Sequence, residues 1–280
     1  MRALIEYDVA RFADLVLPWA NRDPVVNNVL ATNVEAVRNG WRTYDDALWI
    51  TVLDAGDEVV GAAHHTPPYH LFVCRMPDEP LQAVAEVLAP LRGDLPGVTG
   101  ATSAATTFTV AWRQLTGAKV SPGLAQRIYR LDAVLAPVPV AGRLRAASRT
   151  DRDLLVDWIA AFQREAVPAQ PADDAAAAVD RMFAEAGGYL WEVDGQPVCY
   201  AAVRPPAAGV ARIGPVYTPP PERRRGYASA CVAAVSQRVL SAGAEHCMLY
   251  TDLANPTSNS VYQQIGYRPV GDAQDYFFTY

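Results

Sequence analysis

The sequence predicts a mixed α/β (α+β) fold made of two mixed-sheet domains with helices on both faces of each sheet. The first observation is the order of elements in the second half, where two helices and a meander of strand candidates precede alternating helices and strands. The second is a short repeat, because residues 59–68 align without a gap on residues 197–206 and share a valine, an alanine and two closing prolines. The third is size: 280 residues, 51% of them hydrophobic, suffice for one large or two ordinary domains.

The first half contains strand-like apolar runs on either side of the repeated segment. They cover residues 48–54 and 71–76, and the second run leads into a helix over residues 77–91. The prolines and the glycine around residue 137 show no helical periodicity, so we expect a hinge or an exchanged strand there. We therefore divide the chain into domains 1–136 and 137–280.

The second half has clearer start and stop signals. A helix is predicted over residues 151–166, where apolar residues recur at helical spacing, and another over residues 172–186. The remaining elements are strands at 189–193, 197–203 and 210–218, a helix at 226–243, a strand at 246–252, a helix at 256–265, and closing strands at 267–270 and 275–280. An antiparallel meander followed by a β-α-β-α-β run excludes an all-parallel, doubly wound sheet.

Charge and composition narrow the function classes. A net charge of −6 argues against wrapping a nucleic-acid backbone, and no apolar run is long enough for a membrane span. The N-terminus carries charged residues where a secretory signal has its apolar core, so we expect a soluble, cytoplasmic protein. The four cysteines have no C-x-x-C spacing and are expected to be buried, reduced thiols: Cys74, Cys199, Cys231 and Cys247.

The stretch "PPPERRRGYASA", residues 219–230, has the features of an anion site. A loop that leaves a strand and enters a helix near Gly226 points free backbone N–H groups outward at the positive end of the helix dipole. Arg223, Arg224 and Arg225 add charge and forked donors suited to phosphate oxygens. The P-loop and dinucleotide-binding motifs are missing, so the pattern favours a pyrophosphate bound without metal. The alternative interpretation of this stretch is a solvated turn.

A second motif lies in the short helix predicted at 256–265. Asn255 fits the N-cap position and Gly266 the C-terminal stop. Asn255, Asn259 and Tyr262 fall within one narrow stripe of this helix. The alternative is that Tyr262 is an ordinary half-buried tyrosine and Asn259 a surface residue.

With both motifs in order, residues 142–280 resemble a GNAT acyltransferase domain, the superfamily that transfers an acyl group from acyl-CoA to an amine. The loop motif of the family is matched at its fixed positions by Arg223, Gly226 and Ala228. The later helix motif is matched in spacing by Asn255, Tyr262, Gly266 and Tyr267.

The resemblance implies an N-acyltransferase that uses acetyl-CoA as co-substrate and needs no metal. It implies that backbone from Arg224 to Ala228 holds the CoA pyrophosphate, that backbone from Val216 to Thr218 pairs with the pantetheine arm, and that Asn255 contacts the cofactor. The predicted cofactor-binding residues are Val216, Tyr217, Thr218, Arg223, Arg224, Arg225, Gly226, Tyr227, Ala228, Asn255 and Asn259.

Aminolysis of a thioester requires positioning and proton transfers. Bound acyl-CoA and amine react directly once juxtaposed, so no covalent enzyme intermediate is needed. The departing thiolate needs a proton, and Tyr262 is the predicted catalytic acid because a phenol stays protonated at neutral pH. The strand at 210–218 lacks the glutamate that many family members use as base. Glu165, Glu192 and His246 are candidates by residue type alone, and proton loss through water is the alternative.

The first half departs from the family motif. The helix over 77–91 starts with acids and prolines, and no Arg-x-x-Gly-x-Ala precedes it, so domain 1–136 is expected to be a degenerate copy without a CoA loop. His64, His65 and His70 are expected at a solvated loop end and not as metal ligands. A non-catalytic acyl-CoA sensor remains the alternative function. The expected acceptor is a small-molecule or peptide amine, and neither its identity nor the oligomeric state is predicted.

Overall fold

The structure is a computed structural model that describes residues 1–166, 174–185 and 187–280. The first part of the chain forms β1 (Arg2–Glu6), α1 (Val9–Ala20), α2 (Asn28–Arg38), β2 (Leu48–Leu53), β3 (Val59–His65), β4 (Leu71–Val73), α3 (Asp78–Leu88), β5 (Gly97–Ala101), α4 (Thr102–Thr116) and β6 (Lys119–Leu131). The rest forms β7 (Arg143–Ala146), η1 (Arg149–Asp151), α5 (Arg152–Ala166), α6 (Ala175–Glu185), β8 (Gly188–Val193), β9 (Gln196–Val203), β10 (Val210–Tyr217), η2 (Pro220–Glu222), α7 (Tyr227–Ser241), β11 (His246–Asp252), α8 (Pro256–Gln264) and β12 (Arg268–Thr279).

The chain divides into two compact units at positions other than the expected ones. Unit 1 comprises residues 1–127 and 271–280, and unit 2 comprises residues 128–270. The last ten residues, expected in the second domain, therefore lie in unit 1. The reason is strand pairing, since Ala273–Phe277 of β12 pair antiparallel with Gly97–Ala101 of β5. Residues 132–142, around the expected hinge or exchanged strand, contain neither helix nor strand. The strand that pairs with β5 of unit 1 is the C-terminal β12, which the sequence pattern predicts as two short strands.

The two units repeat one order of elements and one pairing pattern. Each has an edge strand, two helices, an antiparallel meander, a helix, a strand parallel to the end of the meander, and a further helix. In unit 1, β3 pairs antiparallel with β2 and β4, and β4 pairs parallel with β5. In unit 2, β9 pairs antiparallel with β8 and β10, and β10 pairs parallel with β11. The predicted mixed α/β fold is confirmed, and the short sequence repeat marks equivalent strands.

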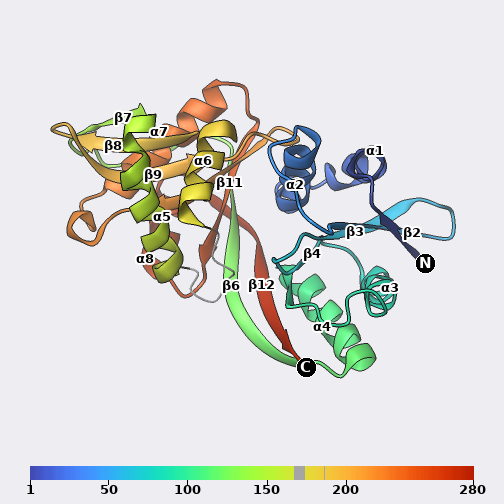
Figure 1. The fold of residues 1–280 in the computed structure, drawn as a ribbon. Helices are drawn as coiled ribbons and strands as arrows, with labels where there is room; N and C mark the ends of the chain where they lie inside the picture. The colour runs from blue at the N-terminus through green and yellow to red at the C-terminus, as the bar shows by residue number, and fades with distance from the viewer. Residues whose placement is uncertain (167–173, 186) are drawn as a thin grey trace. The chain divides into compact units, whose positions relative to one another are not determined.

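The sheet of unit 2 is buried on both faces. Side chains of a strand alternate between faces, and along β9 this alternation separates two core clusters. Cys199 and Ala201 pack with residues of α7 and α8, whereas Tyr200 and Ala202 pack with residues of α5 and α6. Figure 1 shows α5 and α6 together on one side of β8 and β9. The expected layers with helices on both faces are therefore present in this unit.

The core of unit 1 is built around large aromatic side chains. Phe12 of α1 lies 5.4 Å from the ring of Trp49 in β2, measured between ring centroids. Trp112 of α4 stacks on Phe278 of β12 at 6.1 Å. Phe278 lies in the C-terminal strand, so this contact shows directly why residues 271–280 belong to unit 1.

The expectation of a solvated loop end at the histidines is wrong. His64 and His65 lie inside β3 with exposed fractions of 2% and 4%, and His70 is 9% exposed. β3 continues to His65 because it pairs with Leu48 of β2, and the ring of His64 stacks on Trp49 at 5.4 Å. The aromatic packing of unit 1 thus buries side chains that composition suggested were solvated.

Several elements differ in extent from the sequence expectation. The helix expected at 172–186 is present as α6 (Ala175–Glu185), and residues 172, 173 and 186 lie outside the described residues. The long strand β6 and the edge strand β7 were not predicted. All four cysteines are free and buried, as expected. Within the described ranges, every helix is too short or too polar to cross a membrane.

Candidate functional site

The parallel strands β10 and β11 separate before β10 ends. Their register runs from Val210 opposite His246 to Arg212 opposite Met248, and β10 then continues to Tyr217. A bulge against β9 falls between Ile213 and Val216, where one extra residue in β10 bends the strand. The C-terminal part of β10, including Val216 and Tyr217, therefore presents a backbone edge beyond the end of its ladder with β11. An extended ligand arm can pair with such an edge.

The loop after β10 has a backbone suited to anions. Arg224 has a φ of 63° and Gly226 a φ of 82°, so two left-handed residues alternate just before α7. A left-handed conformation is unfavourable for residues with a Cβ, and glycine adopts it freely. A Cβ on Gly226 would also lie 2.9 Å from Cγ1 of Val140. Alternating backbone conformations of this kind turn successive N–H groups toward one concave site, where anions bind.

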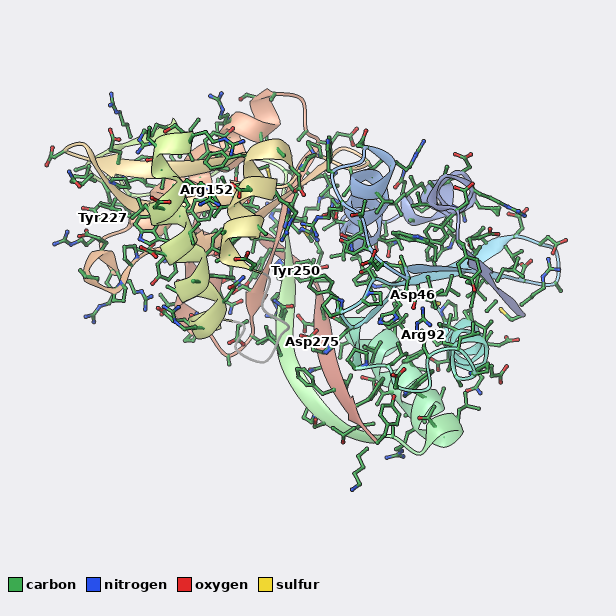
Figure 2. The ribbon with its side chains drawn as sticks, in the orientation of Figure 1. Asp46, Arg92, Arg152, Tyr227, Tyr250 and Asp275 are labelled. Atoms are coloured by element: carbon green, nitrogen blue, oxygen red, sulfur yellow. The ribbon has the colours of Figure 1, made fainter. Side chains whose placement is uncertain are left out.

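The amide groups where this loop enters α7 have no acceptor in the described part of the chain. Among the described residues, the N–H groups from Arg224 to Ser229 donate to no backbone or side-chain oxygen, and the first intrahelical bond is that from Ala230 to the carbonyl of Gly226, at 3.1 Å. The N-cap glycine has no side chain to satisfy them. Free donors and the positive end of α7 thus coincide at Tyr227, labelled in Figure 2.

The three arginines of the loop have different surroundings. Arg223 donates from Nε to the carbonyl of Thr218 at 2.9 Å and from Nη2 to Glu165 at 2.5 Å. Arg225 donates to Glu222 at 2.8 Å. Arg224 is exposed and makes no hydrogen bond or ion pair with the described part of the chain. Of the predicted arginines, Arg224 is thus the one whose side chain is uncommitted.

Helix α8 begins as the sequence predicts. The side chain of Asn255 accepts a hydrogen bond from the backbone of Ser258 at 3.0 Å, which caps the helix, and Pro256 follows at the first helical position. Asn259 lies on the same side of the helix, since its Nδ2 donates to the carbonyl of Asn255 at 2.8 Å and to that of Asp252 at 2.9 Å. The amide of Asn259 therefore anchors the start of α8 to the end of β11.

Tyr129 of β6 is a site neighbour that the sequence analysis missed. Its hydroxyl donates to Oδ1 of Asn259 at 3.0 Å and accepts from Nε2 of Gln263 at 3.1 Å. Its ring lies 6.4 Å from that of Tyr262. The alternation of apolar and polar residues around Ile128 was the available signal for a strand, but nothing in the sequence connects that strand to α8.

Tyr262 of α8 is the predicted catalytic acid. Its side chain faces the core, with 9% of its surface exposed. Burial raises the pKa of its phenol above the ordinary value, and the neighbouring thiols Cys199 and Cys231 raise it further. The phenol therefore stays protonated across the neutral range. It makes no hydrogen bond to another described residue, so its proton is available to a ligand atom.

Thr218 lies where β10 meets the loop and faces the same core cluster. Its hydroxyl is 3.2 Å from Sγ of Cys199, and Cys199 belongs to the cluster that includes Tyr262. The end of β10 and the side chain of Tyr262 therefore border one cluster, although they are far apart in the sequence.

The three candidate bases, Glu165, Glu192 and His246, differ in the residues that they contact. Glu192 of β8 accepts hydrogen bonds from Arg145 at 2.6 Å and from Arg143 at 3.1 Å, and it contacts neither Arg223 nor Arg225. His246 starts β11 at the end opposite the loop, with Nδ1 2.9 Å from Asp132. Glu165 of α5 accepts from Arg223 and from the hydroxyl of Tyr217 at 3.1 Å, so among these three described residues it is the one that bonds to a loop arginine.

Unit 1 has no comparable opening. All of β4, from Leu71 to Val73, pairs with β5 in register. The strands also approach closely, because a Cβ on Gly100 would lie 2.2 Å from the carbonyl oxygen of Val73. Helix α3, which follows β4, has Asp78 and Glu79 in its first turn. Paired strands and an acidic helix start both favour the expectation that this copy holds no CoA pyrophosphate.

A hollow of about 290 Å³ in unit 1 lies away from these strands. It is lined by Tyr7, Val9, Val37, Tyr44, Asp46, Ala47 and Trp49. Asp46 is held at its edge by Arg92 at 2.6 Å, and Figure 2 labels both residues. None of the predicted site residues lines this hollow. In the described ranges, no group of three or more His, Cys, Asp or Glu side chains is arranged to hold a metal ion.

The chain matches a family model over its second half. Residues 152–267 match the model described as the acetyltransferase (GNAT) family. None of the curated protein sequences matches the chain.

Solved structures resemble the whole chain. An acetyltransferase from the GNAT family of Colwellia psychrerythraea is similar at 10% identity with a TM-score of 0.65, and each chain is covered completely, at 100%. A Drosophila protein is similar at 12% identity with a TM-score of 0.69, over 99% of this chain and 98% of the other. A tandem GNAT protein from the clavulanic acid biosynthesis pathway is similar at 14% identity with a TM-score of 0.57, over 99% of this chain and 98% of that one. Residues 152–267 are therefore similar to the acetyltransferase (GNAT) family, and the chain as a whole shares its fold with a tandem GNAT protein.

Proposed function

We propose that the chain is an N-acyltransferase that transfers an acetyl group from acetyl-CoA to a primary amine by direct attack in a ternary complex. The observation that carries the proposal is the run of free N–H groups from Arg224 to Ser229 at the start of α7. These donors match a pyrophosphate in charge and geometry, and the side chain of Arg224 adds a cation beside them. The acceptor is a small-molecule or peptide amine.

Two further features extend the site toward the reacting atoms. The backbone edge of β10 from Val216 to Thr218 follows the end of the β10–β11 ladder and suits the pantetheine arm. Asn255, at the exposed start of α8, and Asn259, one turn further on, are the predicted cofactor contacts on this helix.

Bound acetyl-CoA would supply a thioester whose carbonyl an amine attacks directly, so the protein supplies positioning and proton transfer. A backbone N–H at the end of β10 stabilises the oxyanion, and Tyr262 donates a proton to the departing thiolate. The raised pKa of Tyr262 favours this role, because the phenol remains a donor in the neutral range. The amine loses its proton to water, since Glu192 is paired with Arg145, His246 with Asp132, and Glu165 with Arg223 and Tyr217.

The test is calorimetric titration of acetyl-CoA, followed by thiol-release assays over a panel of amines. The comparison is with a double variant, Arg223→Ala with Gly226→Glu, which adds a carboxylate in the middle of the free amides. We expect micromolar binding by the wild type, loss of binding in the variant, and amine-dependent thiol release. Binding without release from any amine would favour the sensor instead, and absence of binding would refute both functions.

A further inference from the structure

Arg223, the first fixed residue of the loop motif, folds back on the end of β10 and on α5 while remaining partly exposed. Its guanidinium donates to the carbonyl of Thr218 at 2.9 Å and to Oε2 of Glu165 at 2.5 Å. Its Cζ lies 5.7 Å from the centroid of the Tyr217 ring, within the range of a cation–π contact. All three partners belong to the end of β10 or to α5. The side chain thus ties the middle of the loop that connects β10 to α7 back to the start of that loop and to α5.

Glu165 connects this loop to α5 through both of its oxygens. Oε2 accepts a hydrogen bond from Arg223, and Oε1 accepts one from the hydroxyl of Tyr217 at 3.1 Å. Tyr217 is buried, and its ring centroid lies 6.1 Å from that of Trp158, which like Glu165 belongs to α5. The hydrogen bond from Arg223 lowers the pKa of Glu165, so the carboxylate is charged at neutral pH. Hydrogen bonds between charged groups, such as this guanidinium and carboxylate, are shorter and stronger than those between neutral groups.

The position of Glu165 is unusual for an acid beside a polyanion site. A carboxylate near a bound pyrophosphate repels it, so simple electrostatics predicts that removing the charge strengthens binding. Glu222, the partner of Arg225 at 2.8 Å, is a second acid in the same loop. The two acids differ in what they hold. Glu222 contacts a neighbour three residues away, whereas Glu165 contacts the loop from a separate helix.

We propose that Glu165 is a positioning residue that, together with Tyr217, holds Arg223 so that residues 218–223 keep the free amides of Arg224 to Ser229 aimed at one anion. Arg223 then acts on the cofactor through the shape of the loop, and Arg224 provides the direct side-chain charge. This inference rests on the proposed function, because the anion is taken to be the CoA pyrophosphate.

The experiment measures acetyl-CoA affinity and steady-state kinetics in the full-length protein for Glu165→Gln, Arg223→Ala, the double variant, and Glu222→Gln as matched control. We expect Glu165→Gln to weaken binding and raise KM by about fivefold with kcat within about twofold of wild type. Arg223→Ala has a similar or larger effect, and the double variant is no weaker than Arg223→Ala, because both changes break one link. Glu222→Gln binds as tightly as the wild type or more tightly.

Two results would overturn the proposal. One is acetyl-CoA binding by Glu165→Gln that equals or exceeds that of the wild type, as pure charge repulsion predicts. The other is multiplication of the two single effects in the double variant, which would make Arg223 and Glu165 independent. Equal melting temperatures of the wild type and Glu165→Gln show that the change is local.

Hydrogen exchange of the free protein separates this proposal from the proposed function. The amides of Glu222 and Arg223 donate to Pro219 at 2.9 Å and to Pro220 at 3.3 Å. If Glu165 holds the loop, Glu165→Gln accelerates exchange at these amides in the absence of any ligand. A wild type that binds no acetyl-CoA would defeat the proposed function, and unchanged exchange in the variant would defeat the positioning role on its own.

Discussion

The hydroxyl of Tyr129 lies 3.0 Å from Oδ1 of Asn259 and joins the long strand β6 to the first turns of α8. The same hydroxyl accepts from Gln263 at 3.1 Å, so one phenol holds two side chains of the helix that carries Tyr262. The orientation of the predicted acid thus depends on a strand more than a hundred residues earlier in the chain, as the sequence separation of 130 between Tyr129 and Asn259 shows.

Replacement of Tyr129 by Phe removes both hydrogen bonds and keeps the ring. We expect the free energy of unfolding to fall by about 1–2 kcal/mol, because Asn259 and Gln263 lose a partner in a partly buried site. The loosened α8 should also lower kcat by a few fold. Urea denaturation and steady-state kinetics measure the two effects, and unchanged kcat with lowered stability would limit Tyr129 to a structural role.

Replacement of Tyr262 by Phe removes the predicted proton donor and preserves the packing. We expect kcat to fall by roughly 10²-fold, the usual contribution of a general acid, with little change in acetyl-CoA affinity. Because burial raises the pKa of this phenol, the wild-type kcat should show no loss from tyrosine ionisation between pH 7 and about pH 10. An unchanged kcat in the variant would exclude Tyr262 from the chemistry.

Gly226→Ala tests the loop against a matched glycine. Gly226 has φ 82° and Gly195, in the turn between β8 and β9, has φ 78°, so alanine costs about 1 kcal/mol at either position. A Cβ at Gly195 meets no atom within 4 Å, whereas at Gly226 it approaches Val140. Gly226→Ala should therefore lose at least as much stability as Gly195→Ala, and it alone of the two should bind acetyl-CoA more weakly in calorimetry. Equal binding by the two variants would count against the loop as the anion site.

His64 should make unit 1 sensitive to mild acid. Burial lowers the pKa of His64 to about 3, with a smaller contribution from His65. The unfolded chain takes up the proton near pH 6.5 and the folded chain does not, so the contribution of His64 to stability is present above pH 6.5 and is lost as the pH falls toward 3. Between pH 7 and pH 5 this loss amounts to about 2 kcal/mol.

The matched variant is His64→Gln. In the wild type, Nδ2 of Asn33 lies 2.9 Å from Nε2 of His64, and the amide oxygen of a glutamine can still accept a hydrogen bond from it. Its free energy of unfolding should fall less between pH 7 and pH 5 than that of the wild type, as measured by urea denaturation at both values. If His64→Gln shows the same pH dependence as the wild type, the acid sensitivity comes from other groups.

A chain that ends at Val270 tests the division into units. The deletion removes the pairing of β12 with β5 and the packing of Phe278 on Trp112, both within unit 1. Limited proteolysis should therefore cleave first within residues 1–127 and spare residues 128–270. Preferential cleavage within residues 128–270 would instead indicate that the last ten residues stabilise unit 2, as the sequence division implied.

Local patterns determined much of the candidate site. The N-cap at Asn255, the proline after it and the stop at Gly266 follow from local backbone chemistry, and each lies where the sequence places it. The same holds for Gly226, because the left-handed backbone at the start of α7 needs a glycine whatever the rest of the chain does. Cofactor binding by these residues stays a prediction.

Tertiary structure decided which chemical groups are available. The sequence presents Arg223, Arg224 and Arg225 as equivalent cations, and only the fold brings Glu165 of α5 to Arg223 and leaves Arg224 uncommitted. The fold also places Tyr129 against α8, and it puts residues 271–280 of the C-terminal strand in unit 1. The physical reason is range: caps, turns and periodicity depend on residues a few positions apart, whereas ion pairs, strand exchange and burial depend on contacts between segments whose separation along the chain carries no local signal.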